Sequence, residues 1–327
     1  EHLKKIITFN EAVHLERRVG IGAPVERVQR YIGMTRKKAI DLIIDELINS
    51  PDNFNLPLWV ENTTPINFME GGFRGLLRPQ YQIVIDSQKD SLTASWYSQL
   101  LMSDNPQFER LVLFWHNHFV VGFDDAYERP HAYARHILNL RKNANGNLRE
   151  FLRNILLDPG MISYLNNDEN FIDNFNENLG REFLELFTLG EGNYSEKTIK
   201  EAARTLTGYT VNNVNFTPYF NKNGHDFGNK TIFGKTGNFN PSDLVEIIFE
   251  QPTASTFLTS KLWKLYISEL NPPNDELESI SNKFKESDYD LLILVSELLA
   301  SQSFWMEENR GTIIKSPIDL LVGVTRS

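Results

Sequence analysis

Cysteine is absent from this chain of 327 residues, and its absence removes two kinds of structure. Without thiols the chain can form neither disulfide bonds nor metal sites with thiolate ligands. The missing disulfides do not identify a compartment, because a chain of this length buries most of its apolar surface without covalent links. Stability must therefore come from a hydrophobic core, in one large domain or in two smaller ones.

Long apolar runs and long basic runs are missing as well. No uninterrupted apolar segment approaches the roughly 20 residues that a membrane-spanning helix requires. The chain holds 33 Lys and Arg residues against 43 Asp and Glu residues, which gives a formal net charge of -10. Because nucleic-acid binding depends mainly on basic side chains that neutralise phosphates, the composition argues against a nucleic-acid partner. The absence of a long apolar run argues equally against a transmembrane segment in this chain.

The two ends of the chain indicate a piece of a longer protein. The first residue is Glu1 instead of Met, which indicates a processed or trimmed N-terminus, and no signal peptide is visible. The apolar segment from Ile318 to Val324 lies almost at the last residue, without a polar tail. We therefore expect a natural chain that continues beyond Ser327, and the start is compatible with a signal peptide that has been removed.

The hydrophobic periodicity is mainly helical. Helices are predicted over 39–48 (ended by Asn49-Ser50-Pro51), 88–102, 105 to about 119, 130–141, 147–157 (ended by Asp158-Pro159-Gly160) and 195–207. Between Val211 and Phe239, Asn, Gly and Thr replace helix-forming residues, which predicts a small strand or hairpin. The expected fold is mainly α: a multi-helix globular domain with a small β-hairpin excursion around residues 210–240.

Breaks in the pattern divide the chain into three regions. We expect an N-terminal helical region over residues 1–104 and a core helical region over residues 105–270 that carries the polar motifs. A C-terminal helical region, 271–327, begins with Asn271-Pro272-Pro273-Asn274, the clearest linker-like break. The sequence shows no internal repeat.

The segment 176–190 is unusually dense in charged and amide side chains for a short helix. At about 100° per residue, Glu177, Arg181 and Glu185 form one stripe, and Glu182 lies beside it. In one interpretation this is a solvated face with ion pairs between residues four apart. In the other, the stripe faces an interior cleft. Arg181 is then clamped between Glu177 and Glu185, and Glu182 is the freer carboxylate.

Two histidines lie on a helix that is apolar nearly all round, which predicts a buried helix. His116 and His118 project about 200° apart on a helix and therefore cannot bind one metal ion together. His118 lies on the apolar side, where it is either a hydrogen-bonded core histidine or a member of the polar cleft.

A further polar cluster lies between Gly224 and Lys230, where His225 and Asp226 stand beside glycines. One interpretation is a surface loop in which Asp226 accepts hydrogen bonds from local amides. In the other, His225 titrates near neutral pH and a carboxylate orients its ring. Arg204, on the polar side of the preceding helix, can reach the same cleft.

Three smaller features of the sequence concern a helix cap, helix packing and a glycine-rich turn. Asn176 can cap the polar helix, and the small residues Ala202 and Ala203 predict close packing of helix 195–207 against it. Gly234-Lys235-Thr236 is similar to the end of a phosphate-binding loop. The glycine that this motif requires five positions earlier is Asn229, so we reject a phosphate-binding loop.

In combination, these motifs resemble the bacterial family called domain of unknown function 1800. The matching segments span nearly the whole chain: 17–22, 114–119, 176–190, 201–208, His225-Asp226 with Lys230 and Gly234, and Lys315-Ser316-Pro317. The resemblance implies a mainly helical, exported bacterial protein in the periplasm, on the cell surface or secreted. Members are often encoded beside a sulfatase-like family, domain of unknown function 1501, which the resemblance indicates as a partner. No agreed reaction follows from it.

Two hypotheses from different classes follow. In the first, a polar cleft binds or hydrolyses an extracytoplasmic substrate. Its catalytic candidates are Glu182 as a general base, His225, and Arg181 as a holder of an anion or of the carboxylates. Its binding candidates are His118, Asn176, Glu177, Glu185, Arg204 and Asp226. A divalent metal could lie among Glu182, Glu185 and His225, although no established spacing demands one. In the second, the same residues form a closed ionic core in a non-catalytic cell-surface or assembly component.

Overall fold

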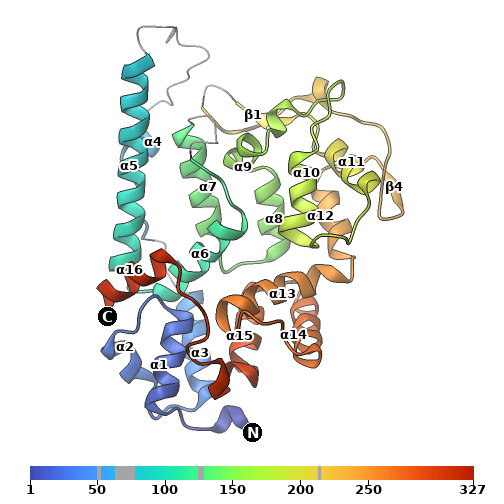
Figure 1. Ribbon diagram of the computed structural model, residues 1–327. Helices are drawn as coiled ribbons and strands as arrows, with labels where there is room; N and C mark the ends of the chain where they lie inside the picture. Colours follow the sequence, from blue (N-terminus) through green and yellow to red (C-terminus); the bar gives the residue numbers. More distant parts are fainter. Residues whose placement is uncertain (50–52, 63–77, 124–128, 213–214) are drawn as a thin grey trace.

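The computed structural model describes residues 1–49, 53–62, 78–123, 129–212 and 215–327. The Ser50-Pro51 helix stop and residues 213–214 of the expected strand region lie outside these residues. The described chain forms sixteen α-helices and two small antiparallel hairpins, so the prediction of a mainly α fold is confirmed (Figure 1). None of the described helices combines the length and apolar character needed to span a bilayer.

The α-helices are α1 (Phe9–Val19), α2 (Val25–Tyr31), α3 (Arg36–Ile48), α4 (Trp59–Asn62), α5 (Arg78–Met102), α6 (Pro106–His118), α7 (Pro130–Asn143), α8 (Leu148–Leu156), α9 (Pro159–Tyr164), α10 (Asn178–Glu182), α11 (Glu196–Thr205), α12 (Pro241–Phe249), α13 (Thr253–Tyr266), α14 (Asn274–Glu286), α15 (Leu291–Ala300) and α16 (Pro317–Arg326). The 3-10 helices are η1 (His2–Lys4), η2 (Asn167–Glu169), η4 (Lys222–Gly224), η5 (Ser303–Trp305) and η6 (Glu307–Asn309). The segment η3 (Phe183–Thr188) is a π-helix.

Side-chain caps explain where several helices begin. The Asn105 side chain accepts a hydrogen bond from the Phe108 amide at 3.1 Å, and Pro106 occupies the first turn of α6 as predicted. After α8 ends at Leu156, Asp158 does more than stop a helix. Its side chain accepts a hydrogen bond from the Met161 amide at 2.9 Å and so caps α9. This short helix was not predicted from the sequence.

One large apolar core holds the helices together. It draws fully buried side chains from helices along the whole chain, among them Leu15, Trp115, Phe151, Leu262 and Leu298. All three regions expected from the sequence contribute to this core, and α13 packs against α14 across the Pro272-Pro273 break. The boundaries at 104 and 270 stay a prediction.

Helix α16, near the C-terminal end of the described chain, packs against the N-terminal segment. Figure 1 shows the red C-terminal segment running from the α13–α15 group past α1 to α16, which packs against the base of α5. The contact with the N-terminal segment is close because both sides carry glycine. A Cβ at Gly22, whose φ is +81°, would lie 2.6 Å from the Gly323 carbonyl oxygen.

The two hairpins occupy the predicted 210–240 region. Strand β1 (Tyr209–Val211) pairs with β2 (Pro218–Phe220), and β3 (Lys230–Ile232) pairs with β4 (Lys235–Gly237). The β3–β4 turn is made by Phe233 and Gly234, which both have positive φ, as the tightest hairpin turns require. Gly234-Lys235-Thr236 therefore belongs to a hairpin, in agreement with the rejection of a phosphate-binding loop.

Helices α10 and α11 approach each other closely at small residues, as Ala202 and Ala203 predicted. An added Cβ at Gly180 would lie 3.0 Å from the Ala203 backbone nitrogen and 3.2 Å from its Cα. Neither atom can move without displacing the α11 backbone. Gly180 therefore sets the distance between the polar segment and α11.

We expect Gly180→Ala to destabilise the protein by about 1 kcal/mol or more, measured by denaturant unfolding. Alanine improves helix propensity by up to about 1 kcal/mol, but overpacking against the Ala203 backbone costs about 1–3 kcal/mol. The control is Gly146→Ala, where the nearest atom lies 3.6 Å away. An unchanged or higher stability for Gly180→Ala would contradict the tight α10–α11 contact.

Candidate functional site

The polar segment is not one continuous α-helix. Helix α10 ends at Glu182 and passes directly into the π-helix η3, in which the Leu189 amide donates to the Leu184 carbonyl five residues earlier, at 3.0 Å. The wider turn rotates Glu185 away from the stripe drawn at 100° per residue. The predicted clamp of Arg181 between Glu177 and Glu185 is therefore wrong.

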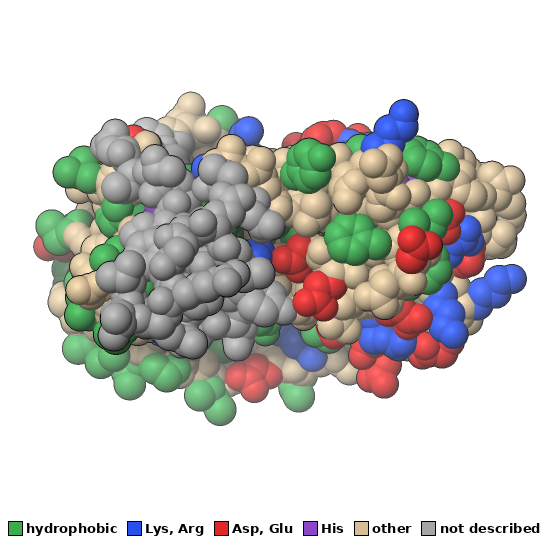
Figure 2. Space-filling view, turned by 90° about the horizontal axis from the view of Figure 1, so that it is seen from above, with side chains coloured by type: hydrophobic (Ala, Val, Ile, Leu, Met, Phe, Trp, Pro, Cys, Tyr) green, Lys and Arg blue, Asp and Glu red, His purple; other side chains and the backbone are tan. Residues whose placement is uncertain are grey.

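Arg181 instead bridges two helices at the surface. Its guanidinium lies 3.1 Å from Glu177 and 2.9 Å from Glu196, at the start of α11. The Glu196 hydrogen bond is the main reason why the pKa of Arg181 is raised. All three side chains are substantially exposed, and Figure 2 shows acidic and basic side chains interleaved at the end of the molecule formed by α11 and β4. This cluster matches the solvated-face interpretation.

The other polar residues of the segment have separate roles. The Asn176 side chain accepts a hydrogen bond from the Asn178 amide at 3.0 Å, where α10 begins. Glu185 accepts a hydrogen bond from the Tyr194 hydroxyl at 2.7 Å. Within the described residues the half-buried Glu182 carboxylate has no hydrogen-bond or ion-pair partner. Burial, and then the neighbouring Glu185, raise the pKa of Glu182.

His118 lies in the apolar core. Its Nε2–H donates to the Phe187 carbonyl at 3.1 Å, and its ring stacks on Phe114 with 5.7 Å between centroids. Burial lowers the pKa of His118 to about 4, so the ring is neutral at neutral pH. These contacts are those of a core histidine that supports the π-helix from inside.

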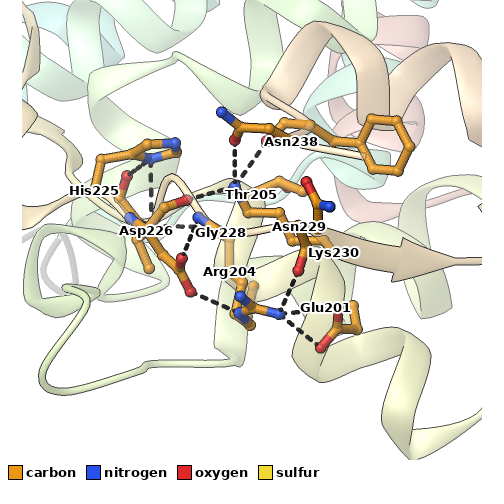
Figure 3. Close-up of polar contacts among 12 residues, drawn as sticks. Glu201, Arg204, Thr205, His225, Asp226, Gly228, Asn229, Lys230 and Asn238 are labelled. Carbon is orange, nitrogen blue, oxygen red and sulfur yellow. Dashed lines mark hydrogen bonds and ion pairs between the residues drawn. The ribbon is translucent and has the colours of Figure 1, made fainter. Parts of the chain in front are cut away.

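His225 and Asp226 join Arg204 in a second, more enclosed network at the other end of α11 (Figure 3). Arg204 Nε lies 2.7 Å from Asp226 Oδ2, and its Nη1 lies 3.0 Å from Glu201. Burial alone would raise the pKa of Asp226, but the hydrogen bonds from Arg204 and from the Gly228 amide hold it below its ordinary value. His225 Nδ1–H donates to the Thr207 carbonyl at 2.7 Å, and burial lowers the pKa of its ring.

Sequence reasoning missed two members of this network. The Glu201 carboxylate accepts both Arg204 Nη1 and the Thr231 amide, and so ties α11 to β3. The ammonium of Lys230 is fully buried and donates to Asn238 Oδ1 at 3.1 Å and to the Phe239 carbonyl at 3.2 Å. Both residues stood in segments that resemble the family, but a lysine in a short strand carries no local sign of burial.

The predicted residues therefore do not form one cleft. Glu196 and Arg204 are eight residues apart on α11, or about 12 Å at the usual helical rise, so the two ionic clusters lie at opposite ends of that helix. His118 lies in a third place, inside the core. In the part of the chain that the structure describes, no three His, Asp or Glu side chains are placed to hold a metal ion. The arrangement of Glu182, Glu185 and His225 around a metal is thus not formed.

A large cavity lies elsewhere, between α1, α13 and the segment that leads into α16. Its volume is about 740 Å³. Six cationic side chains line it against two carboxylates: Arg17, Arg18, Arg110, Lys264, Arg310 and Lys315, with Glu307 and Asp319. This balance is strongly positive in a chain whose net charge is -10.

The cations differ in how they are compensated. Arg110 lies 2.7 Å from Asp319, and Arg310 lies 3.6 Å from Glu11. Arg18 is only 8% exposed and donates to the Asn309 carbonyl at 3.1 Å, but it has no carboxylate partner among the described residues. Burial, and then Arg110, lower the pKa of Arg18 to about 10, which leaves the guanidinium charged at neutral pH. A buried cation without a counter-ion is costly unless an anion compensates it.

Two segments that carry the family resemblance, but no predicted role, both contribute side chains to the cavity lining. Arg17 and Arg18 belong to the arginine-glycine segment 17–22, and Lys315 belongs to the lysine-serine-proline segment. The Gly22–Gly323 contact brings them together across nearly the whole chain length. Local sequence patterns carry no signal for such a pairing, so the cavity could not be found from them.

The fold and these sites define a mainly helical protein with structural ion networks and a basic cavity between the two ends of the described chain. The chain belongs to a family without an assigned function: the family model described as "Protein of unknown function (DUF1800)" matches residues 14–327. The recognition of this family from the sequence is thereby confirmed. Comparisons with the curated proteins and with the solved structures found no match.

The two arginines of α10 and α11 should differ in their contribution to stability. In the Arg204 network the side-chain exposures are 23%, 16% and 11% for Arg204, Glu201 and Asp226. Arg204→Gln leaves two mostly buried carboxylates unpaired, and we expect a loss of about 2–3 kcal/mol in the free energy of unfolding. Arg181→Gln removes exposed pairs and should cost less than about 1 kcal/mol. Equal losses in denaturant unfolding would show that the distinction is wrong.

Acid should destabilise the protein through three histidines. Burial lowers the pKa of His14, His116 and His118 to about 4 from 6.5. Between pH 6.5 and 4 the unfolded state binds more protons than the folded state, so stability is full above this window and falls as the pH drops through it. We expect His116→Gln to flatten this dependence by up to about 1.36 kcal/mol per pH unit. Denaturant titrations across the window test this, and an unchanged slope would refute it.

Proposed function

We propose that the protein binds an anionic molecule in the basic cavity, with Arg18 as the central contact. The observation that carries this proposal is a buried guanidinium without a carboxylate partner in the described residues, facing a cavity of about 740 Å³. A guanidinium presents several donors in one plane and matches carboxylate, sulfate or phosphate oxygens. Arg17, Lys264 and Lys315 add positive charge around it.

The remaining cavity contacts support binding rather than proton transfer. His14 Nε2–H donates to the Phe304 carbonyl at 2.8 Å, and burial lowers the pKa of its ring to about 4. His14 is therefore neutral at neutral pH and keeps its Nδ1 lone pair. The carboxylate of Asp319 is held by Arg110 at 2.7 Å. With Asp319 paired and His14 neutral, Glu307 is the lining carboxylate that remains against the unpaired cations of the cavity.

A second candidate function is hydrolysis with Glu182 as the general base. It is favoured by one observation: this half-buried carboxylate has no partner among the described residues and a raised pKa. It lies at the junction of α10 and the π-helix, and π-helical turns are frequent at functional sites. The basic cavity is the stronger candidate because its volume and unpaired cations favour a specific class of ligand.

The family resemblance supplies the setting of the proposal. Exported relatives support an extracytoplasmic location, in the periplasm, on the cell surface or secreted. Their sulfatase-like neighbours support a partner whose chemistry involves anionic esters, which agrees with an anion-binding cavity. In this proposal the protein is a non-catalytic component, as in the second hypothesis, and its role is to bind an anion.

Isothermal titration calorimetry with inorganic phosphate and sulfate tests the proposal. Arg17→Gln and Lys264→Gln should each weaken binding about three- to tenfold, because a hydrogen bond to a charged group contributes about 1.5–3 kcal/mol before solvent screening. Both side chains are exposed, so neither change threatens folding.

Two variants serve as controls for this titration. Lys142→Gln makes the same charge change at an exposed position on α7 outside the cavity lining and should bind as the unmodified protein does. Glu182→Gln should also leave anion affinity unchanged. Absence of binding, or equal affinity for the two cavity variants and the unmodified protein, would refute the proposal. Loss of binding in Glu182→Gln would move the site to the polar segment.

A further inference from the structure

The mouth of the basic cavity carries two strongly exposed apolar side chains. Ile314, which lines the cavity, is 81% exposed, and Leu270 is 76% exposed. They are two of the four most exposed large apolar side chains among the described residues. The two loops lie side by side, because the Ile314 amide donates to the Glu269 carboxylate at 3.3 Å. Single exposed apolar residues are common on protein surfaces, but two of them on neighbouring loops beside a basic cavity are a distinct feature.

The interior of the cavity is also mixed in character. Val13, Leu265 and Ile313 line it together with the cations. A small inorganic anion would use the guanidinium and ammonium groups but would leave these apolar side chains without a partner. A ligand with an anionic head and an apolar body uses both.

We infer that the anion bound in the cavity is the phosphate headgroup of an anionic lipid, and that this face docks on the surface of an anionic membrane. The inference rests on the proposed function and names its ligand. Ile314 and Leu270 enter the interfacial layer of the bilayer, and Lys264 and Lys315 lie near the headgroups. Combined apolar insertion and electrostatic attraction is how proteins bind a membrane surface without spanning it.

The distribution of charge restricts the expected membrane contact to the face that carries the basic cavity. The whole chain is acidic, but the face with unpaired cations can approach an anionic surface without local repulsion. At physiological salt, charges are screened beyond about 8 Å. The six cavity cations outnumber the two carboxylates that line the same cavity, Glu307 and Asp319, so this face is locally positive when it is turned to the membrane.

A bilayer fits the observations better than an acidic protein does. Ile314 is 81% exposed at the cavity lining, and Leu270, 76% exposed, lies outside that lining, so a small ligand inside the cavity would leave Leu270 uncovered. A bilayer accommodates protruding apolar tips without a complementary surface, whereas a stable protein partner must match the shape of the whole face.

Vesicle co-sedimentation tests the inference with the full chain. We expect binding to vesicles of phosphatidylcholine mixed with phosphatidylglycerol, and none to phosphatidylcholine alone. The double variant Leu270→Ser, Ile314→Ser should lose most vesicle binding but keep its affinity for inorganic phosphate. The matched control is Leu58→Ser, since Leu58 is 80% exposed and lies outside the cavity lining. Lys264→Gln should reduce both kinds of binding, with about a fivefold loss on vesicles.

The outcomes separate this inference from the proposed function. Binding of free phosphate without binding of vesicles would overturn the membrane inference and leave the anion cavity in place. Vesicle binding that is unaffected in Lys264→Gln and in the double variant would also overturn it, because the cavity would not be involved. Tight binding of polyglutamate by a protein that ignores vesicles would overturn it in favour of an acidic protein partner. Failure to bind phosphate, sulfate and vesicles alike would remove both proposals.

Discussion

A charged group that is taken out of water needs a partner, and the arrangement of this protein depends on that constraint. Glu109 and Arg141 are almost completely buried and form two hydrogen bonds of 2.8 and 2.9 Å that join α6 to α7. The Arg204 network joins α11 to β3 in the same way. Arg18 and Lys230 are both buried and lack a carboxylate partner in the described residues. The Lys230 ammonium is held by three oxygen acceptors, whereas the Arg18 guanidinium donates to the Asn309 carbonyl and lines the cavity. Arg18 is informative because its charge has fewer partners than that of Lys230 and faces a cavity.

Close packing at two glycines brings together the segments that carry the charged residues. The close contacts at Gly180 and at Gly22 bring helical segments to distances that a side chain would prevent. The first contact holds α10 against α11, the two helices that the Arg181 cluster bridges. The second brings the arginine-glycine segment to α16 and closes the basic cavity. In both places the glycines determine the geometry and the charged residues determine the chemistry.

Local rules predicted much of the fold and little of the site. Asn105 and Pro106 identified the start of α6, and the composition after Val211 identified the hairpins, because caps and turns depend on neighbouring residues. The spacing of four residues predicted Glu177 as a partner of Arg181. The second partner, Glu196, was not predictable in this way, since it lies on another helix and the π-helix changes the angular spacing of Glu185. The cavity required a contact between residues 22 and 323, which no local pattern records.

The net charge of the chain does not determine which ligands a local site can bind. A net charge of -10 describes the average field of the chain, and it bears on solubility and on contacts at long range. Binding is decided within about one screening length of the ligand. Inside that distance Arg18 lies among other cations, and the carboxylate of Asp319 is already paired with Arg110. An acidic protein can therefore bind an anion wherever the fold concentrates cations and removes their counter-ions, and the opposed ends of this chain provide that arrangement.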